Sequence, residues 1–361
     1  MNVDFPLRQT DRATSPADRA KILSDPGFGR YFTDHMASAR WTPDAGWHDH
    51  RVAALRPYSL HPGTAVLHYA QEIFEGLKAY RHADGSVWLF RPELNARRFR
   101  DSARRLALPD LDEHAFLASV EAVVRADEPW VPDHGGEESL YLRPYMFASE
   151  AFLGMRPAEE VVYAVIASPA GPYFASGVIG VTLWISTVYT RAAVGGTGPA
   201  KCGGNYAGSL AAQIEAREHG CDQVMYLDGA EVRWLEESGT MNVFLVTADG
   251  ELVTPMLGTI LEGVTRASVL ELATDHGLRA IERQIGLDEL RDGCRSGGIT
   301  EAFAVGTAAV ITPIVGFKGD GYEFAVGDNR PGKTTLAVRE HILDIQYGRV
   351  PDKRGWLRRV V

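Results

Sequence analysis

Hydrophobic and polar positions follow two different periods in the first half of the chain. Short alternating or continuous hydrophobic stretches, such as residues 86–91 behind the turn 82–85, predict strands. Two other stretches repeat their hydrophobic residues at helical spacing and predict helices at 93–106 and 113–125. The first 30 residues lack either pattern and are expected to form an arm.

The pattern in the second half of the chain predicts strands separated by single helices. Residues 222–255 contain three or four strand signals with Asp-Gly turns at 228–229 and 249–250, so this sheet is expected to be mostly antiparallel. Further strands are predicted at 181–191 and, broken at 306–307, over 299–317. Helices are predicted at 207–219, after residue 263 and at 333–347.

A Pro-, Gly- and Ser-rich stretch, SPAGPYFASG at 168–177, separates the two halves. We therefore expect a mixed α/β chain of two domains, with a smaller N-terminal domain over 1–170, a connector over 171–179 and a larger C-terminal domain over 180–361.

Composition narrows the class of protein. The 361 residues are 45% hydrophobic, enough for real cores, and the net charge of −10 leaves no basic stripe for nucleic acid. The start is polar, and no run reaches the ~18 apolar residues of a membrane helix. Three widely spaced cysteines fit a reducing compartment. We expect a cytoplasmic protein without nucleic-acid, membrane or metal partners.

The stretch GDNRPGKT at 327–334 satisfies the phosphate-binding expression G-x-x-x-x-G-K-T and would predict a nucleotide-binding protein. Such a loop normally opens a parallel sheet, whereas only 27 residues follow Thr334. A turn that caps the last helix is the favoured interpretation, with nucleotide binding as the alternative.

A single amine stands among small residues in GGTGPAKCGGNYAGSL at 195–210. Lys201 could form an imine with an aldehyde cofactor such as pyridoxal phosphate, and the small neighbours would leave it room to move. An exposed loop lysine is the alternative. Cys202 could be a nucleophile, although a small packing residue is the favoured interpretation.

Two further residues suit the same cofactor. Tyr206 could hold its phenolate oxygen, and Glu237 could keep a proton on the ring nitrogen, which makes the ring an electron sink. Glu236 is the competing choice for the second role.

A phosphate group needs helix N-terminal amides and a guanidinium group. Residues 263–265 start a predicted helix, and the turn 306–308 offers a hydroxyl and amides. Among the arginines at 97–105, Arg98 lies beside the predicted buried stripe of its helix, so it is the one expected to turn inward.

Eight segments resemble the class IV, or fold-type IV, aminotransferases, and within them the branched-chain amino-acid aminotransferases. They occur in the family's order from about residue 28 to 348, and they read FTDHM, LHYAQEIFEGLKAY, FRPELNARR, LYLRPYMF, KCGGNY, EESGTMNVF, ILEGVTR and VGTAAVITP. The resemblance implies the fold of D-amino-acid aminotransferase and a homodimer with pyridoxal 5′-phosphate at the domain interface.

The resemblance also implies roles for single residues. Lys201 corresponds to the Schiff-base lysine and Glu237 to the partner of the ring nitrogen. The other implied cofactor ligands are Arg98, Tyr206, Val264, Thr265 and Thr307. The implied substrate residues are Phe32, Tyr69, Tyr141, Arg143, Leu153, Met155, Tyr173, Thr240, Thr307 and Ala308.

By the same resemblance, the expected reaction is reversible amino transfer between L-leucine, L-isoleucine or L-valine and 2-oxoglutarate, with Arg143 receiving the second carboxylate of glutamate. Tyr69, Leu153 and Met155 are expected to reach the partner subunit's site. Another class IV enzyme, a D-amino-acid transaminase or an aminodeoxychorismate lyase, is the nearest alternative.

Overall fold

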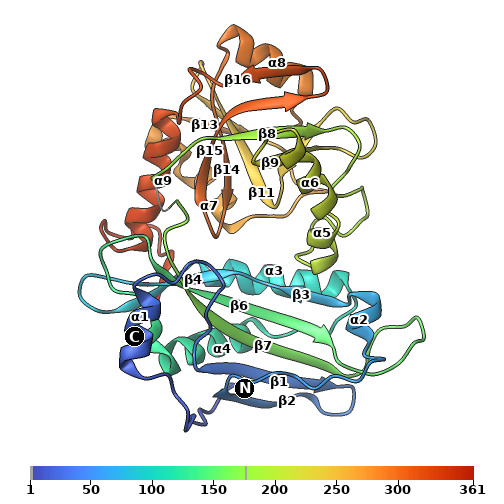
Figure 1. Cartoon of the computed structure of the whole chain (residues 1–361), viewed down its shortest axis with the longest axis vertical. Coiled ribbons are helices and arrows are strands. Elements are labelled where there is room, and N and C mark those ends of the chain that lie inside the picture. Colours follow the sequence, from blue (N-terminus) through green and yellow to red (C-terminus); the bar gives the residue numbers. More distant parts are fainter. Residues whose placement is uncertain (1–2, 175–176) are drawn as a thin grey trace. The chain divides into compact units, whose positions relative to one another are not determined.

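The computed structural model describes residues 3–174 and 177–361. The described chain falls into two compact units (Figure 1). Unit 1 runs to Tyr173 and includes Ala200–Gly203 and Asp344–Val361, while unit 2 comprises Phe174–Pro199 and Gly204–Leu343. Residues 175–176, in the predicted connector 171–179, lie outside the described residues.

The two units and the predicted domain limits differ in two segments. The last strand, β17 (Leu357–Arg359), pairs with β5 (Val87–Phe90) of unit 1. Ala200–Gly203 also belongs to unit 1, so the candidate lysine lies there. The domain limits 1–170 and 180–361 therefore remain a prediction from the sequence.

Unit 1 is built on one mostly antiparallel sheet. Within the described residues its strand order is β17-β5-β4-β6-β7-β1-β2, and β3 pairs with β6. Its other strands are β1 (His35–Thr42), β2 (Gly46–Ala54), β3 (Glu72–Phe74), β4 (Leu77–Arg81), β6 (Ser139–Ala148) and β7 (Val161–Ala170). Its helices are α1 (Pro16–Leu23), α2 (Ala65–Tyr69), α3 (Pro92–Arg105), α4 (Glu113–Ala126) and the 3-10 turn η1 (Glu128–Trp130).

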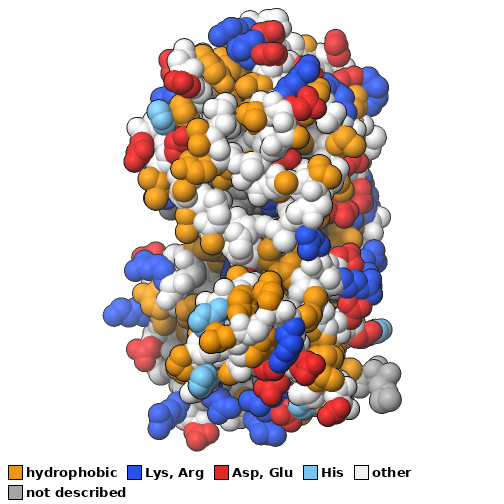
Figure 2. Space-filling model, turned by 90° about the vertical axis from the view of Figure 1, so that its right-hand side faces the viewer, with side chains coloured by type: hydrophobic (Ala, Val, Ile, Leu, Met, Phe, Trp, Pro, Cys, Tyr) orange, Lys and Arg blue, Asp and Glu red, His pale blue; other side chains and the backbone are white. Residues whose placement is uncertain are grey.

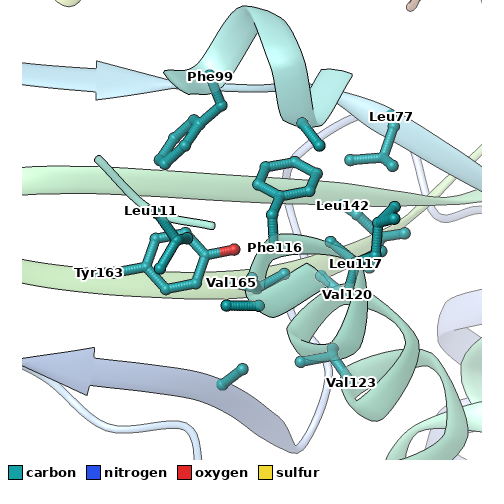
Figure 3. Close-up of a cluster of buried hydrophobic side chains, with 14 of the residues drawn as sticks. Leu77, Phe99, Leu111, Phe116, Leu117, Val120, Val123, Leu142, Tyr163 and Val165 are labelled. Atoms are coloured by element: carbon teal, nitrogen blue, oxygen red, sulfur yellow. The ribbon is translucent and has the colours of Figure 1, made fainter. Parts of the chain in front are cut away.

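The core of unit 1 lies between this sheet and the helices α3 and α4. Phe99 of α3 and Phe116 of α4 have ring centroids 5.3 Å apart, and both are buried with Tyr163 of β7 (Figure 3). Proline at the first position of α3 and the Asp112 side chain, which accepts from the His114 amide at 2.8 Å, start the two helices. This packing fixes α3, and Ser102 on the same helix accepts a hydrogen bond from the amide of the candidate lysine.

Unit 2 is a second sheet, nine-stranded within the described residues, in the order β10-β9-β8-β15-β14-β11-β12-β13 with β16 paired to β15. The additional pairing of β10 with β11 closes part of this sheet into a ring. The strands are β8 (Val181–Ser186), β9 (Gln223–Leu227), β10 (Leu235–Ser238), β11 (Met241–Thr247), β12 (Glu251–Thr254), β13 (Arg279–Glu282), β14 (Ile299–Gly306), β15 (Val310–Gly319) and β16 (Tyr322–Ala325). The helical elements are α5 (Gly203–Ala207), α6 (Leu210–Glu218), α7 (Val264–Leu272), η2 (Ala273–His276), α8 (Leu287–Ser296) and α9 (Lys333–Gln346).

Most predicted elements are confirmed to within one or two residues, including α3, α4 and α9 and the largely antiparallel pairing. Two predictions are wrong. The strand expected over 181–191 ends at Ser186, where the Tyr189 amide donates to the serine hydroxyl at 3.1 Å and turns the chain. The helix expected over 207–219 begins only at Leu210, since the short helix α5 ends at Ala207 and the Ser209 hydroxyl donates to the Tyr206 carbonyl at 2.7 Å between them.

The predicted N-terminal arm contains a helix, α1, whose first turn is capped by Ser15. Leu7 also forms a parallel bridge to Val52 of β2. In the described residues, no helix combines the length and the apolar character that crossing a membrane requires.

Candidate active site

The backbone around Lys201 is held on unit 1 by three hydrogen bonds. The Lys201 amide donates to the Ser102 hydroxyl at 2.9 Å, and its carbonyl accepts from the Phe74 amide at 3.0 Å. The amide of Gly203 donates to the Glu72 carboxylate. A side chain on residue 203 would collide with that carboxylate, which explains one of the glycines beside the lysine. The lysine is thus tied to α3 and β3.

The Lys201 amine has an environment that favours its neutral form. Burial, and then the Arg98 guanidinium, lower the pKa of Lys201 to about 8. Its Nζ lies 5.0 Å from the centroid of the Phe74 ring. At pH 7 about one amine in ten is then unprotonated, against fewer than one in ~10³ for an ordinary lysine. Such an amine is a nucleophile and a base near neutral pH.

Arg98 turns inward from α3 and forms a two-point ion pair with Glu75. Its Nε lies 2.6 Å from Oε1 and its NH2 lies 2.8 Å from Oε2. Asn95, one helical turn earlier, donates to Oε2 at 2.7 Å. Burial alone would raise the pKa of the Glu75 carboxyl, but Arg98 holds it below its usual range. The pair is therefore charged at neutral pH.

Tyr141 and Arg143 lie on one face of β6, two residues apart. The Arg143 guanidinium donates to the Tyr141 hydroxyl at 3.1 Å and stands 4.7 Å from the centroid of the Phe74 ring. A side chain on Gly76 would collide with the Tyr141 hydroxyl, so only glycine allows this approach. We call these five residues the lysine cluster: Glu75, Arg98, Tyr141, Arg143 and Lys201.

Glu237 of β10 has its own set of partners in unit 2. Its Oε1 accepts from Asn242 Nδ2 at 2.8 Å and from the Leu261 amide at 3.0 Å, and its Oε2 pairs with Arg191. The side chains of Glu237 and Arg191 are 1% and 4% exposed, so the charges compensate each other away from water. We call Arg191, Glu237, Asn242 and the Leu261 amide the glutamate cluster.

Glu236, the competing carboxylate, has a different environment. Its Oε1 accepts from the Thr259 hydroxyl at 2.5 Å, and burial raises the pKa of its carboxyl. A group biased toward its neutral acid form is poorly suited to hold a positive charge. Glu237, with an arginine partner and two neutral donors, is the better candidate of the two.

Asn242 connects the glutamate cluster to the two predicted phosphate turns. It pairs with Val305 across β11 and β14, just before the turn that carries Thr307 and Ala308. A side chain on Gly263 would collide with its amide oxygen, which places the N-terminus of α7 beside it. At that N-terminus Val264 and Thr265 are 9% and 7% exposed. Glu237, the start of α7 and the turn at Thr307 thus lie around Asn242.

Tyr206 and Thr240 complete the predicted set on unit 2. Tyr206 lies in the short helix α5 and is half-buried, and Thr240 is exposed in the turn between β10 and β11. The remaining predicted substrate residues with apolar or aromatic side chains belong to unit 1 and are exposed. They are Phe32, Tyr69, Leu153, Met155 and Tyr173. Within unit 1 the Tyr69 hydroxyl donates to the Leu153 carbonyl at 2.5 Å.

Four residues of these clusters were missed from the sequence: Glu75, Arg191, Asn242 and Leu261. A signal for Glu75 existed, since it is one of the few charged residues in the largely apolar stretch 73–80. Asn242 follows the Glu-Glu pair by only five residues. Arg191 gave no signal, because it lies in a stretch that was predicted to be strand.

The alternative nucleotide-binding loop is closed by the chain itself. The Glu301 carboxylate accepts from the amides of Thr334 and Thr335 at 3.0 and 2.7 Å, and from the Thr335 hydroxyl at 2.7 Å. These are the donors that a phosphate would need at the start of α9. A side chain on Gly332 would collide with Glu301. The motif is thus an internal cap of α9.

Cys202 packs in the hydrophobic core of unit 1 and is 3% exposed. This favours the packing role over the nucleophile.

Comparison with known proteins identifies the family. Residues 72–317 match the family described as amino-transferase class IV, and the chain belongs to it. The chain is 51% identical over 362 residues to the branched-chain-amino-acid aminotransferase of Mycolicibacterium smegmatis. The aligned residues cover 99% of this chain and 98% of that protein.

Solved structures agree with this assignment. The Escherichia coli branched-chain amino acid aminotransferase superposes with a TM-score of 0.73 at 27% identity and covers 90% of this chain and 100% of its own. The Thermobaculum terrenum enzyme, solved in its pyridoxal-phosphate form, gives a TM-score of 0.72 at 25% identity, with coverage of 90% and 98%. The mixed α/β fold expected for fold-type IV is thereby confirmed.

Proposed function

We propose that the chain is a branched-chain amino-acid aminotransferase with pyridoxal 5′-phosphate as its cofactor. It exchanges the amino group between L-leucine, L-isoleucine or L-valine and 2-oxoglutarate. The observation that carries the proposal is Lys201 in a class IV aminotransferase: its backbone is held by Ser102 and Phe74, and burial and Arg98 lower the pKa of its amine to about 8.

The donors present suit this cofactor. Pyridoxal phosphate, when bound, supplies an aldehyde for an amine and a ring that withdraws electrons from the reacting carbon. Lys201 offers a partly neutral amine, Arg98 offers a guanidinium for phosphate, and Glu237 offers a carboxylate that Arg191 keeps charged. Tyr206 would hold the phenolate oxygen, and Val264, Thr265 and Thr307 would hold phosphate oxygens.

The work of the chain is then divided among few groups. With the cofactor and an amino acid bound, the Lys201 amine would act as the base that takes the α-proton of the amino acid, and in the reverse half of the exchange as the acid that returns a proton to the α-carbon. The Glu237 carboxylate would hold a proton on the ring nitrogen of the bound cofactor. Because the Lys201 pKa is near the working pH, its amine can accept and release this proton with little cost in either direction.

Substrate recognition is a further part of the proposal. Tyr141 and the backbone at Thr307 and Ala308 would bind the α-carboxylate, and Arg143 would bind the second carboxylate of glutamate. The aliphatic side chains would contact a wall comprising Phe32, Tyr69, Leu153, Met155, Tyr173 and Thr240. One site could then accept an apolar and an acidic side chain in turn.

A homodimer is part of the proposal. Leu153 and Met155 are 69% and 89% exposed, and Tyr69 is 37% exposed. Figure 2 faces the side of the molecule on which α2 lies, where hydrophobic side chains stand exposed among charged ones. Such residues are explained if they line the partner subunit's site. We place the enzyme in the cytoplasm, which suits its three cysteines, none of them in a disulfide.

Replacing Lys201 tests the function. Lys201→Ala should lower transamination of L-leucine with 2-oxoglutarate by more than about 10³-fold and abolish the visible colour of the purified protein. Lys21→Ala, on the helix α1, is the control and should keep both. A Lys201→Ala enzyme with normal turnover would overturn the proposal.

Donor profiling separates the alternative within the family. We expect L-leucine, L-isoleucine and L-valine to be good amino donors and D-alanine to be inactive. Strong activity with D-alanine and none with L-leucine would instead identify a D-amino-acid transaminase.

A further inference from the structure

Glu75 is a buried carboxylate for which the function above requires no role. Its side chain is 0% exposed and lies in the link between β3 and β4. Its oxygens have close polar contacts with Arg98 at 2.6 and 2.8 Å, with Asn95 at 2.7 Å and with the Gly76 amide at 3.1 Å. A buried charge with this many partners is fixed in position.

The helix α3 presents these partners at one spacing. Asn95, Arg98 and Ser102 stand at positions i, i+3 and i+7, so they share one face of the helix. The first two bind Glu75, and the third binds the Lys201 amide at 2.9 Å. The same helical face therefore holds both the carboxylate and the lysine backbone.

We propose that Glu75 is a positioning residue of the aminotransferase: its carboxylate fixes the plane of the Arg98 guanidinium and offsets the positive charge that acts on Lys201. This role rests on the proposed function, in which Lys201 is the reactive amine of the aminotransferase. Arg98 alone would place a full positive charge beside the amine inside the protein. The ion pair reduces that charge and keeps the amine able to hold a proton part of the time.

The charges that act on Lys201 are few and have known signs. Arg98 of α3 and Arg143 of β6 favour the neutral amine, while Glu75 and the Tyr141 hydroxyl group favour the protonated amine. The effect of Arg98 exceeds that of Glu75. Removing Glu75 alone should therefore lower the pKa of Lys201 further, and removing Glu75 and Arg98 together should raise it. A residue with only a structural role would not reverse the sign.

The test is a titration of Lys201 in the full-length chain freed of cofactor by dialysis. Competitive acetylation with acetic anhydride is measured across pH 6–11, and the Lys201 peptide is quantified by mass spectrometry. For Glu75→Gln we expect the midpoint to fall by roughly one pH unit. For Glu75→Asp, which keeps the charge, the midpoint should stay close to that of the unmodified chain.

The double variant Glu75→Leu with Arg98→Met keeps the test open if Glu75→Gln does not fold, because apolar replacement of a whole buried ion pair is often tolerated. Its midpoint should lie above that of the unmodified chain. Glu113→Gln is the control: it removes a carboxylate that pairs with Arg100, another arginine of α3 outside the lysine cluster, and the midpoint should not change.

An unchanged or raised midpoint in Glu75→Gln, an equal fall in Glu113→Gln, or a lowered midpoint in the double variant would each overturn the role of Glu75. No substrate enters the titration. Failure of the proposed function would appear instead as absent transamination with an intact titration.

Discussion

The lysine cluster and the glutamate cluster are each built on a buried pair of one arginine and one glutamate, but the two pairs have opposite assignments. In the pair Arg98–Glu75 the arginine is the proposed ligand and the glutamate supports it. In the pair Arg191–Glu237 the carboxylate is the proposed ligand and the arginine supports it. The same ion pair can thus present either charge, depending on which partner faces the ligand.

The neutral contacts of the two carboxylates are alike. Asn95 and the Gly76 amide both donate to Oε2 of Glu75. Asn242 and the Leu261 amide both donate to Oε1 of Glu237. The supporting role and the ligand role must therefore be separated by experiment.

Removal of the arginines should have the largest effect. Arg191→Met and Arg98→Met each leave a buried carboxylate without its cation, and we expect each to lower the free energy of unfolding by about 3–5 kcal/mol. Urea unfolding of the cofactor-free chains measures this. Affinity for pyridoxal phosphate should fall at least about tenfold more in Arg98→Met. Equal losses of affinity would remove the distinction between ligand and support.

Replacing the proposed carboxylate ligand should have the next largest effect. Glu237→Gln keeps the shape and loses the charge, so kcat for L-leucine should fall by about 10²-fold, or about 2.7 kcal/mol, while the cofactor is still bound. Single-turnover kinetics with a cofactor titration separate the two quantities. Glu236→Gln is the control, and a larger loss of kcat there would exchange the two assignments.

The residues of the two clusters could be predicted from the sequence only where a local sequence pattern marked them. The helical stripe placed Arg98 inward, and the order of segments placed Glu237 and Lys201 in a family. The supporting residues were not predictable, since Glu75 meets Arg98 across 23 positions and Arg191 meets Glu237 across 46. Arg191 also required the strand to end at Ser186, a turn made by one hydroxyl.

The predicted domain limits and the two compact units differ for a similar reason. The pairing of β17 with β5 joins positions more than 260 residues apart, and no local pattern encodes it. The turn at 327–334 shows the converse. Its local pattern fits a phosphate loop, but Glu301, brought in from β14, accepts the amides that define the motif.

Lys201 should lower the free energy of unfolding at neutral pH, whereas the Arg98–Glu75 pair beside it should raise this free energy. The pKa of Lys201 is lowered from 10.5 to about 8, so between these pH values the unfolded chain binds more protons than the folded one. The free energy of unfolding should therefore rise with pH through this window. Lys201→Met should remove that rise and stabilise the cofactor-free chain at pH 7 by about 1–3 kcal/mol.

Urea unfolding at pH 7 and pH 10 checks both statements. A Lys201→Met chain that is less stable than the unmodified chain at pH 7 would show that folding does not disfavour the protonated amine. In that case its low pKa could not explain its reactivity.

The smallest effect is expected at an ion pair that copies the geometry of the lysine cluster without its burial. Arg104, on the same helix as Arg98, also binds a carboxylate at two points, with NH2 2.6 Å and Nε 2.9 Å from Asp110 Oδ2. Both side chains are about half exposed. Water and salt screen such a pair, so Asp110→Asn should lower the free energy of unfolding far less than Arg98→Met does and should leave the titration of Lys201 unchanged. A cost equal to that of Arg98→Met, measured by urea unfolding, would mean that geometry rather than burial gives the Arg98–Glu75 pair its strength.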